Sequence, residues 1–301
     1  MKKTLAMMTA AMMVAGALTG CGSSSSTPAA TTAAATEAAT TAAATEAATD
    51  AATTEAAGDT AAAAEGSVKT PSGKFTVGFD QEFPPMGFVG DDGQFTGFDL
   101  DLAKEVASRL GLEFVPQPIN WDAKDMELDS GNIDCIWNGF TMQGREDAYT
   151  WVGPYMANNQ VFVVNADSDI ASKADLAGKA VEVQKDSSGL AALQDDAELS
   201  ASFGSMTEVA DYNTALMDLE SGACDAVCMD SIVAGYQIKS SGKDMKILDD
   251  TLAAEEYGIG FKKGEDELAK AVYDTLMEMK DDGTVAKISN DWFGSDVFTL
   301  K

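Results

Sequence analysis

Two short stretches of the sequence end in side chains that could bind charged groups of opposite sign. In the first, Thr141 supplies a hydroxyl and Arg145 a planar guanidinium, which matches a carboxylate through two parallel hydrogen bonds. In the second, Asp230 supplies a carboxylate suited to an ammonium group. An arginine and an aspartate on the two sides of a cleft would together bind a zwitterion.

Each of these charges also has an ordinary structural interpretation. Arg145 could form a surface ion pair with Glu146 or Asp147, which follow it directly. Asp230 could cap the N-terminus of a helix, a common role for aspartate after a strand, and capping would not exclude ligand binding. The sequence leaves both alternatives open.

A third polar stretch, residues 184–189, lies between a predicted strand and a predicted helix. The hydroxyls of Ser187 and Ser188 and the free N–H groups of a helix N-terminus favour a carboxylate. Plain helix capping by either serine explains this stretch equally well when it is read alone.

An internal repeat indicates the elements that carry these side chains. Residues 126–139 recur as residues 217–230, at a constant offset of 91 residues. In both copies Met, an acid, Leu, an acid, Ser and Gly precede a short apolar run, which predicts a helix, a glycine at its C-terminus and a buried strand. The repeat therefore predicts two α/β lobes of related architecture. A chance match of a common helix–glycine–strand pattern is the alternative.

Hydrophobic periodicity and turn residues indicate alternating strands and helices around this repeat. Strands are predicted at residues 74–79, 112–115, 133–137, 161–164, 176–183 and 226–229, and helices at residues 97–111, 121–130, 188–194 and 212–221. Strand–helix–strand units form parallel sheets, in which ligands bind beyond the carboxyl ends of the strands. The residues that follow 137 and 229 are thus expected to share a cleft.

The N-terminus reads as an export signal. Two lysines precede an apolar run at residues 5–18 that is too short and too rich in Ala, Gly and Met for a typical transmembrane span. The run ends in Leu-Thr-Gly-Cys21, which resembles the lipobox of bacterial lipoproteins. We therefore expect residues 1–20 to be a signal peptide and Cys21 to carry the lipid; a plain secretory signal with a chance cysteine is the alternative.

Residues 21–68 are predicted to be a disordered tether. After Cys21 they consist almost entirely of Ser, Thr, Ala and Glu, with no aromatic residue. Such a segment buries too little apolar surface to offset the entropy of ordering it. It would let the folded part, which begins near Lys69, range away from a membrane.

Charge and composition exclude several classes of function. The net charge of −29 argues against nucleic acid or anionic lipid as a partner, and the absence of histidine excludes His-based catalysis and His-ligated metals. We expect neither a cofactor nor a metal site. Cys224 and Cys228 lie four residues apart on a predicted strand, about 13 Å, which is too far for a disulfide, so they are expected to be buried small hydrophobic residues.

Seven stretches after Phe75 form a recognisable series. In order they are VGFDQEFPPMGF, TGFDLDLAKEVASRLG, IDCIWNGFTMQGRE, VEVQKDSSG, DAVCMDSIVAGY, EYGIGFKKG and DDGTVAKISNDWFG. No single stretch is decisive, but the series covers nearly all of the predicted folded part. It resembles the extracellular solute-binding proteins of polar amino-acid ABC transporters, the family of glutamine-, histidine- and cystine-binding proteins.

The resemblance implies an α/β fold of the periplasmic-binding-protein-like type II class, a two-lobed flytrap with a two-strand hinge. Lobe 1 would comprise residues 69–160 and be completed by residues 257–301, and lobe 2 would comprise residues 161–256. Ligand would bind between the lobes.

The resemblance also implies roles for individual residues. Arg145 would clamp the α-carboxylate with Thr141 and the Gly139 backbone, helped by Ser187 and Ser188 from the other lobe. Asp230 would bind the α-ammonium, and aromatic residues would wall the side-chain pocket unless they belong to the ordinary core. The full expected binding set is Asp80, Phe83, Trp121, Asn138, Gly139, Thr141, Arg145, Gln184, Ser187, Ser188 and Asp230.

One departure from the family pattern affects the carboxylate clamp. Relatives commonly read Thr-x-Thr-x-x-Arg, whereas Thr141-Met-Gln-Gly-Arg145 is one residue shorter and lacks the second hydroxyl. Gly144 is expected to permit the tighter turn.

The function implied is that of a lipid-anchored, monomeric substrate-binding protein on the extracytoplasmic face of the cell membrane, which delivers a polar amino acid to an ABC transporter permease. Neutral polar amino acids or cystine are expected before basic ones, and acidic ones are disfavoured because Lys185 is the one extra basic residue near the predicted pocket. Two alternatives are a tethered signalling receptor and a dehydratase-like enzyme that uses Asp80 or Glu82 as a general acid.

Overall fold

The computed structural model describes Thr70 and residues 72–301. The predicted signal peptide, the lipidation site Cys21 and the predicted tether lie outside the described residues. In the described part of the chain, no helix has the length and apolar character needed to cross a bilayer.

One mixed sheet of eight strands runs through the described part, in the order β5-β1-β6-β11-β7-β10-β8-β9. Its strands are β1 (Lys74–Phe79), β5 (Glu113–Pro118), β6 (Cys135–Thr141), β7 (Tyr149–Asn165), β8 (Ala180–Gln184), β9 (Ser205–Val209), β10 (Ala226–Asp230) and β11 (Met245–Lys262). A small antiparallel sheet contains β2 (Glu82–Phe83), β3 (Gly87–Val89) and β4 (Phe95–Thr96).

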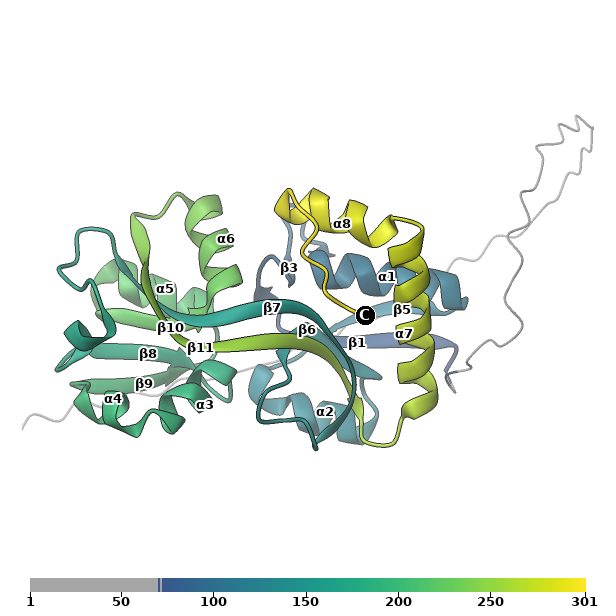
Figure 1. Cartoon of the computed structure of the whole chain (residues 1–301), viewed down its shortest axis with the longest axis horizontal. Helices are drawn as coiled ribbons and strands as arrows, with labels where there is room; N and C mark the ends of the chain where they lie inside the picture. The colour runs from purple at the N-terminus through teal and green to yellow at the C-terminus, as the bar shows by residue number, and fades with distance from the viewer. Residues whose placement is uncertain (1–69, 71) are drawn as a thin grey trace, which may run out of the picture. The chain divides into compact units, whose positions relative to one another are not determined.

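Two of these strands are much longer than the rest. β7 has 17 residues and β11 has 18, and they pair antiparallel from one end to the other. In Figure 1 they extend across the centre and link two groups of elements, one with β1, β5 and β6 and the other with β8, β9 and β10. The fold is thus two-lobed, and β7 and β11 are the strands that join the lobes.

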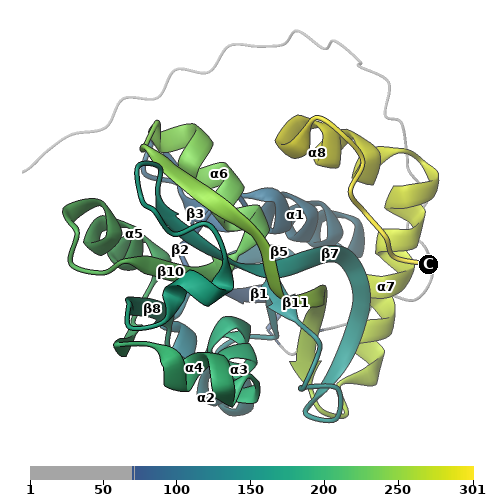
Figure 2. The same ribbon diagram turned by 60° about the vertical axis from the view of Figure 1, so that its left-hand side comes forward.

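Helices cover both faces of each lobe, as the turned view in Figure 2 also shows. The first lobe carries α1 (Phe98–Leu110), η1 (Trp121–Ala123), α2 (Lys124–Ser130), α7 (Asp266–Asp281) and α8 (Thr284–Phe293). The second carries η2 (Lys173–Leu176), α3 (Ser188–Asp195), α4 (Ala197–Ser202), α5 (Tyr212–Ser221) and α6 (Ser231–Ser241).

The hydrophobic core follows the two-residue period of the strands. Val163 and Val227 face one continuous core that runs through both lobes, whereas their neighbours Phe162 and Cys228 face a separate core under α3 in the second lobe. A smaller cluster around Phe140 covers the corresponding face of the first lobe. The polar residues of the cleft therefore project from a rigid, packed sheet.

The repeated segment forms equivalent structure in both lobes, as predicted. α2 ends before Gly131 and α5 before Gly222, and both glycines are left-handed with φ of 77° and 78°. A buried strand follows each cap, β6 in the first lobe and β10 in the second. The shared half of the repeat is scaffold.

Several predicted strand boundaries are wrong, among them those of β5 and β6. β5 begins at Glu113 and continues to Pro118, and β6 begins at Cys135 and continues to Thr141, four residues past the predicted end. The extension of β6 arises because Phe140 and Thr141 pair with Gly258 and Tyr257 of β11, a long-range contact that no local apolar run reveals.

The C-terminal segment packs on the first lobe. The Trp292 indole donates to Asp101 at 2.8 Å, Phe293 stacks edge-to-face on Phe98, and the backbone N–H of Thr299 donates to the Tyr155 carbonyl. The exact lobe boundaries at 160/161 and 256/257 stay a prediction.

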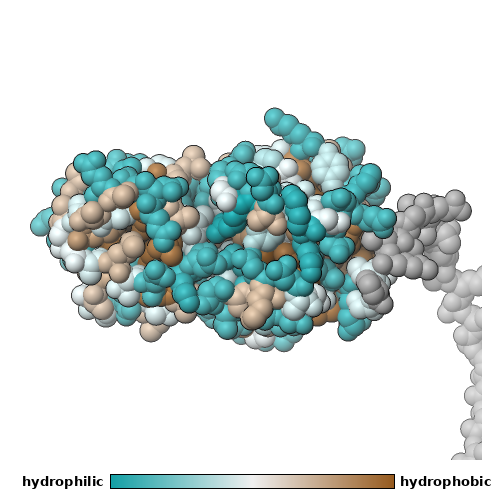
Figure 3. Space-filling model, turned by 90° about the horizontal axis from the view of Figure 1, so that it is seen from below, coloured by the Kyte–Doolittle hydropathy of each residue, from teal (hydrophilic) through white to brown (hydrophobic). Residues whose placement is uncertain are grey.

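Cys135, Cys224 and Cys228 are buried free thiols, which confirms the expectation for the latter two. Cys224 lies just before β10 rather than on it. Hydrophilic residues predominate on the face shown in Figure 3, where apolar residues form small separate areas.

Candidate functional site

A small cavity lies between the lobes, and nine of the eleven predicted binding residues line it. They are Phe83, Trp121, Gly139, Thr141, Arg145, Gln184, Ser187, Ser188 and Asp230. The first five come from the first lobe and the other four from the second. The structure thus brings the predicted set together, while its binding role stays a prediction.

Arg145 lies at the tight turn that follows β6. Its backbone N–H donates to Met142 at 3.0 Å, and Gly144 has φ +77°, so the glycine permits the short turn as expected. The guanidinium donates to the Thr141 carbonyl at 3.2 Å and lies over the Phe140 ring. Arg145 forms no ion pair with Glu146 or Asp147, all three being described residues, so that alternative is wrong.

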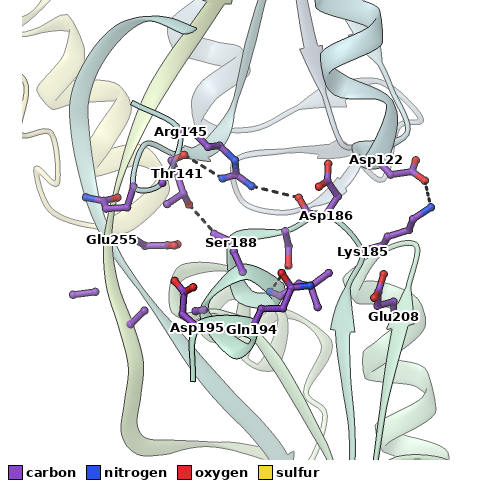
Figure 4. A pocket seen from close by; sticks show the side chains of 18 residues that line it. Asp122, Thr141, Arg145, Lys185, Asp186, Ser188, Gln194, Asp195, Glu208 and Glu255 are labelled. Atoms are coloured by element: carbon purple, nitrogen blue, oxygen red, sulfur yellow. Dashed lines mark hydrogen bonds and ion pairs between the residues drawn. The ribbon is translucent and has the colours of Figure 1, made fainter. Parts of the chain in front are cut away.

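The two serines of the second lobe face Arg145 and Thr141 across the cleft. Ser187 caps α3, since its hydroxyl accepts from the Leu190 N–H at 3.1 Å. Ser188 begins the helix, and its hydroxyl accepts from Thr141 at 3.1 Å, a contact between the lobes that Figure 4 shows. A helix N-terminus and a guanidinium on opposite sides of one space favour an anion between them.

Asp230 lies at the end of β10 and is 3% exposed. It occupies the N-cap position of α6 without a side-chain capping bond, so the capping alternative is wrong. Its carboxylate instead accepts from the Tyr257 hydroxyl at 2.7 Å, the Asn158 amide at 2.7 Å and the Tyr212 hydroxyl at 3.2 Å. Burial, followed by the nearby Glu255, raises the pKa of Asp230 well above its usual range.

Three neighbours of Asp230 were missed by sequence reasoning. Asn158 and Gln160 project from β7, and Glu255, 5% exposed, projects from β11. The alternation Asn-x-Gln just before an apolar run indicates that one face of this strand is polar. It does not indicate which residues of neighbouring strands lie beside that face, because this depends on pairing between distant segments.

The other end of the cavity suits a ligand side chain. Phe83 and Trp121 provide aromatic walls, and the Gln184 amide donates to the Asp80 carboxylate at 2.7 Å across the cleft. Burial raises the pKa of Asp80 to about 6. Asp80 also lines a wider groove that continues outward between the lobes and contains Lys185, as expected for the distal part of a ligand.

Asn138 does not line the cavity. Gly139 has φ +56°, so the simple alternation of side chains along a strand does not fix the direction of Asn138. The Asn138 side-chain oxygen accepts from the backbone N–H of Asp80 at 2.8 Å. Asn138 thus positions the Asp80 backbone, and a direct contact with ligand stays a prediction.

Two reciprocal ion pairs also join the lobes. Lys124 of α2, only 2% exposed, pairs with Asp186, and Lys185 pairs with Asp122 at 2.8 Å. The Asp186 carbonyl accepts from Arg145 at 3.4 Å as well. Lys124 and Asp186 were not predicted. The sequence contains one signal for Lys124, because this lysine occupies a helix position that the apolar periodicity would assign to a hydrophobic residue.

Among the described residues, no group of three or more Cys, Asp or Glu side chains is arranged to hold a metal ion. What the cleft offers is a set of hydrogen-bonding and charged groups around an enclosed space, with aromatic walls at one end. This is the chemistry of binding a small polar molecule.

Comparison with known proteins agrees with this architecture. Residues 75–295 match the family described as bacterial extracellular solute-binding proteins, family 3. The chain belongs to this family. Its two-lobed α/β fold is therefore that of a solute-binding protein.

Relatives within the family bind different amino acids. The L-cystine-binding protein TcyJ of Escherichia coli (strain K12) is 31% identical over 231 residues, which cover 75% of this chain and 84% of the relative. A substrate-binding protein of an ABC uptake transporter from Streptococcus pneumoniae, solved with bound histidine, has a TM-score of 0.73 and 34% identity and covers 76% of this chain and 95% of its own. An ancestral arginine-binding protein solved with arginine has a TM-score of 0.69 and 36% identity, with 74% and 99% covered.

Proposed function

We propose that this solute-binding protein captures an amino acid between its lobes and delivers it to the permease of an ABC transporter. The observation that carries the proposal is the placement of Arg145 and Asp230 on opposite lobes around one small cavity. A guanidinium pairs with the α-carboxylate, supported by the Ser188 hydroxyl, and the Asp230 carboxylate accepts from the α-ammonium.

Two charge-assisted contacts in a cleft of this kind contribute about 1.5 to 3 kcal/mol each, and burial of the ligand side chain adds to them. Together they support micromolar or tighter binding. Binding would recruit the second lobe and shift an equilibrium between open and closed forms. Delivery rather than conversion is the role, because the site offers binding groups and its relatives are binding proteins.

The ligand class follows from the distal end of the site. Beyond Trp121 the groove is lined by the carboxylates of Glu82, Glu208 and Asp211, with Lys185 among them. This charge pattern repels an acidic side chain and suits a second group that carries an ammonium. L-Cystine, whose second half is itself zwitterionic, is the first candidate, followed by the basic amino acids, whose cationic side chains suit the same carboxylates, and then by neutral polar ones.

Calorimetry with L-cystine and the twenty standard amino acids tests this function. At least one should bind with micromolar or lower Kd, and Arg145→Ala or Asp230→Asn should weaken that binding at least tenfold, since each removes one charge-assisted contact. Arg109→Ala is the matched control, because Arg109 pairs with Glu105 and Asp282 on the surface of the first lobe. Unchanged affinity in Arg145→Ala would show that the carboxylate site is elsewhere.

We further propose that the protein is a monomer anchored by a lipid on Cys21 at the extracytoplasmic face of the membrane. The Leu-Thr-Gly-Cys21 motif and the low-complexity segment after it support this arrangement. Cys21→Ala should move the protein from the membrane fraction to the soluble fraction of the culture. Retention of the variant in the membrane fraction would contradict lipid anchoring.

A further inference from the structure

Two buried carboxylates lie side by side on the cleft face of the second lobe, and strand register places them there. Asp230 of β10 pairs with Gln160 of β7, and Glu255 of β11 pairs with Asn158 of β7. Asn158 and Gln160 are two residues apart on β7, so both pairs project from the same face of the sheet. Because β7, β10 and β11 are hydrogen-bonded neighbours, the two acids meet across β7.

The two acids are connected through hydrogen bonds from neutral side-chain amides only. One nitrogen, the Asn158 side-chain amide, donates to Asp230 at 2.7 Å and to Glu255 at 2.6 Å. The Gln160 amide nitrogen donates to Glu255 at 2.9 Å. In the described part of the chain, neither acid forms an ion pair with a lysine or arginine.

The cluster has more acceptors than donors. The side-chain oxygen of Gln160, a residue with no exposed surface, is buried without a hydrogen-bond partner among the described residues. Burial and the neighbouring Glu255 disfavour the charged form of Asp230, so one proton is expected on the pair. An ammonium group, with three N–H donors and a positive charge, supplies what the cluster lacks.

Both acids face the space where the ligand is proposed to bind. Asp230 lines the small cavity together with Arg145, and Glu255 lines the adjoining side of the cleft with Thr141 and Ser188. In Figure 4, Glu255 points from its strand toward Ser188, below Thr141 and Arg145. A ligand whose carboxylate meets Arg145 would therefore present its ammonium toward both acids.

We propose that Glu255 and Asp230 form a two-carboxylate receptor for the α-ammonium, in which the ligand replaces a proton shared by the two acids. This inference rests on the proposed function. On binding, the O–H bond of the protonated carboxyl breaks and its proton passes to solvent. Ammonium N–H groups then donate to the freed oxygens, so the positive charge between the acids is conserved.

The other titratable groups that face the pair do not supply this proton. Tyr212 of α5, Tyr257 of β11 and Cys228 of β10 are buried, and burial raises the pKa of each well above its ordinary value, so they stay neutral at neutral pH. Arg145 from the first lobe remains charged and faces the ligand carboxylate. Burial and Glu255 raise the pKa of Asp230, in the direction that a shared proton requires.

Calorimetry in two buffers of different ionisation enthalpy, phosphate and Tris, measures the proton released per ligand. With L-cystine, L-arginine and L-glutamine as probes at neutral pH, each one that binds should release about one proton. Glu255→Gln, which keeps the shape of the side chain, should at least halve this release and raise Kd about tenfold. Glu256→Gln is the matched control, because Glu256 is exposed on the opposite face of β11 and should change neither quantity.

Infrared spectroscopy of the wild-type protein provides a readout that does not depend on the variant. The difference spectrum on ligand addition should show loss of a protonated carboxyl band. Binding without proton release, or release and affinity unchanged in Glu255→Gln, would overturn the two-carboxylate receptor and leave the proposed function intact. Failure of every amino acid to bind would overturn both.

Discussion

Asp99 is a buried carboxylate in the first turn of α1 that holds the backbone next to the cleft. Its side chain accepts from the backbone N–H of Gly139 at 2.7 Å and from the Tyr155 hydroxyl at 2.8 Å. Burial raises the pKa of Asp99 to about 7, although these hydrogen bonds act in the opposite direction. A supporting residue of the cleft is thus titratable near neutral pH.

We expect this residue to make the protein less stable as the pH rises from about 4 to about 7. In that interval folded Asp99 keeps a proton that the unfolded chain, with a pKa near 3.8, has released, so the free energy of unfolding decreases with pH. The predicted loss is on the order of 2 to 4 kcal/mol, from about 1.4 kcal/mol for each unit of pKa difference. Asp99→Asn should flatten the profile in denaturant unfolding at several pH values, whereas Asp91→Asn, on an exposed loop, should follow the wild type.

At the residue scale, the sequence predicted the charged pair Arg145 and Asp230 because each follows an apolar run at a place where ligands bind in α/β folds. It did not predict Glu255 or Asn158. Their importance depends on the register between β7, β10 and β11, which pairs residues nearly a hundred positions apart. The position of Asn138 outside the small cavity was missed for the same reason, since side-chain direction is fixed only once strand boundary and pairing are known.

At the element scale, α1 begins where the chain passes very close to another loop. Gly97 has φ +146°, and a Cβ atom there would lie 2.2 Å from the Met86 carbonyl oxygen. The backbone N–H groups of Phe98 and Asp99 donate to the Pro85 and Met86 carbonyls. The start of the helix that carries Asp99 is thereby fixed to the loop that follows Phe83.

Gly97→Ala should therefore destabilise the protein by about 3 kcal/mol or more, through both an unfavourable φ and a contact that the backbone must relieve. Gly93→Ala offers a matched comparison, because Gly93 also has positive φ, +76°, but has no atom near the added methyl. It should cost about 1 kcal/mol. Equal losses for the two variants in thermal or denaturant unfolding would contradict the role of close packing at Gly97.

Elements with local signals were predicted well. Helices with an apolar stripe and a glycine cap, such as α1 and α5, have the predicted ends to within a residue. Strands were predicted too short where neighbours extend them, above all β7, of which only residues 161–164 were expected. The remainder of β7 is interrupted by Gly153 and Pro154 and ends in the polar residues 158–160, so local sequence does not predict a strand, and it is one because it pairs with β11.

At the scale of the whole binding unit, closure depends on contacts between the lobes that do not involve a ligand. Lys124 is buried on the first lobe and its charged partner Asp186, about half exposed, comes from the second. Asp186 also has φ +57°, a left-handed conformation that aspartate and asparagine tolerate better than most residues. A buried lysine that meets its partner only across the cleft favours the closed form.

Asp186→Asn should weaken binding of every amino acid by about 2 kcal/mol, because it leaves Lys124 buried without a counter-charge. Lys124→Met should weaken binding less, since the carboxylate that remains is partly exposed, and the double variant should recover part of the loss. Lys270→Met is the control: its pair with Asp274 is exposed, lies within α7 away from the cleft and contributes about 0 to 1 kcal/mol. Calorimetry gives the affinities, and small-angle scattering with ligand gives the closed fraction.

Effects confined to one amino acid would assign Asp186 to side-chain recognition rather than to closure. A double variant that binds ligand more weakly than Asp186→Asn alone would support the same assignment. In either case the fraction of closed protein at saturating ligand should match that of the wild type.

β7 and β11 join the two lobes, and they also carry Asn158, Gln160 and Glu255. A change in the bend of these strands must shift the acceptors around the proposed ammonium site. Conversely, a ligand that moves those acceptors must change the bend of the same strands. The affinity for the group that all amino acids share and the balance between open and closed forms would therefore depend on the same few residues.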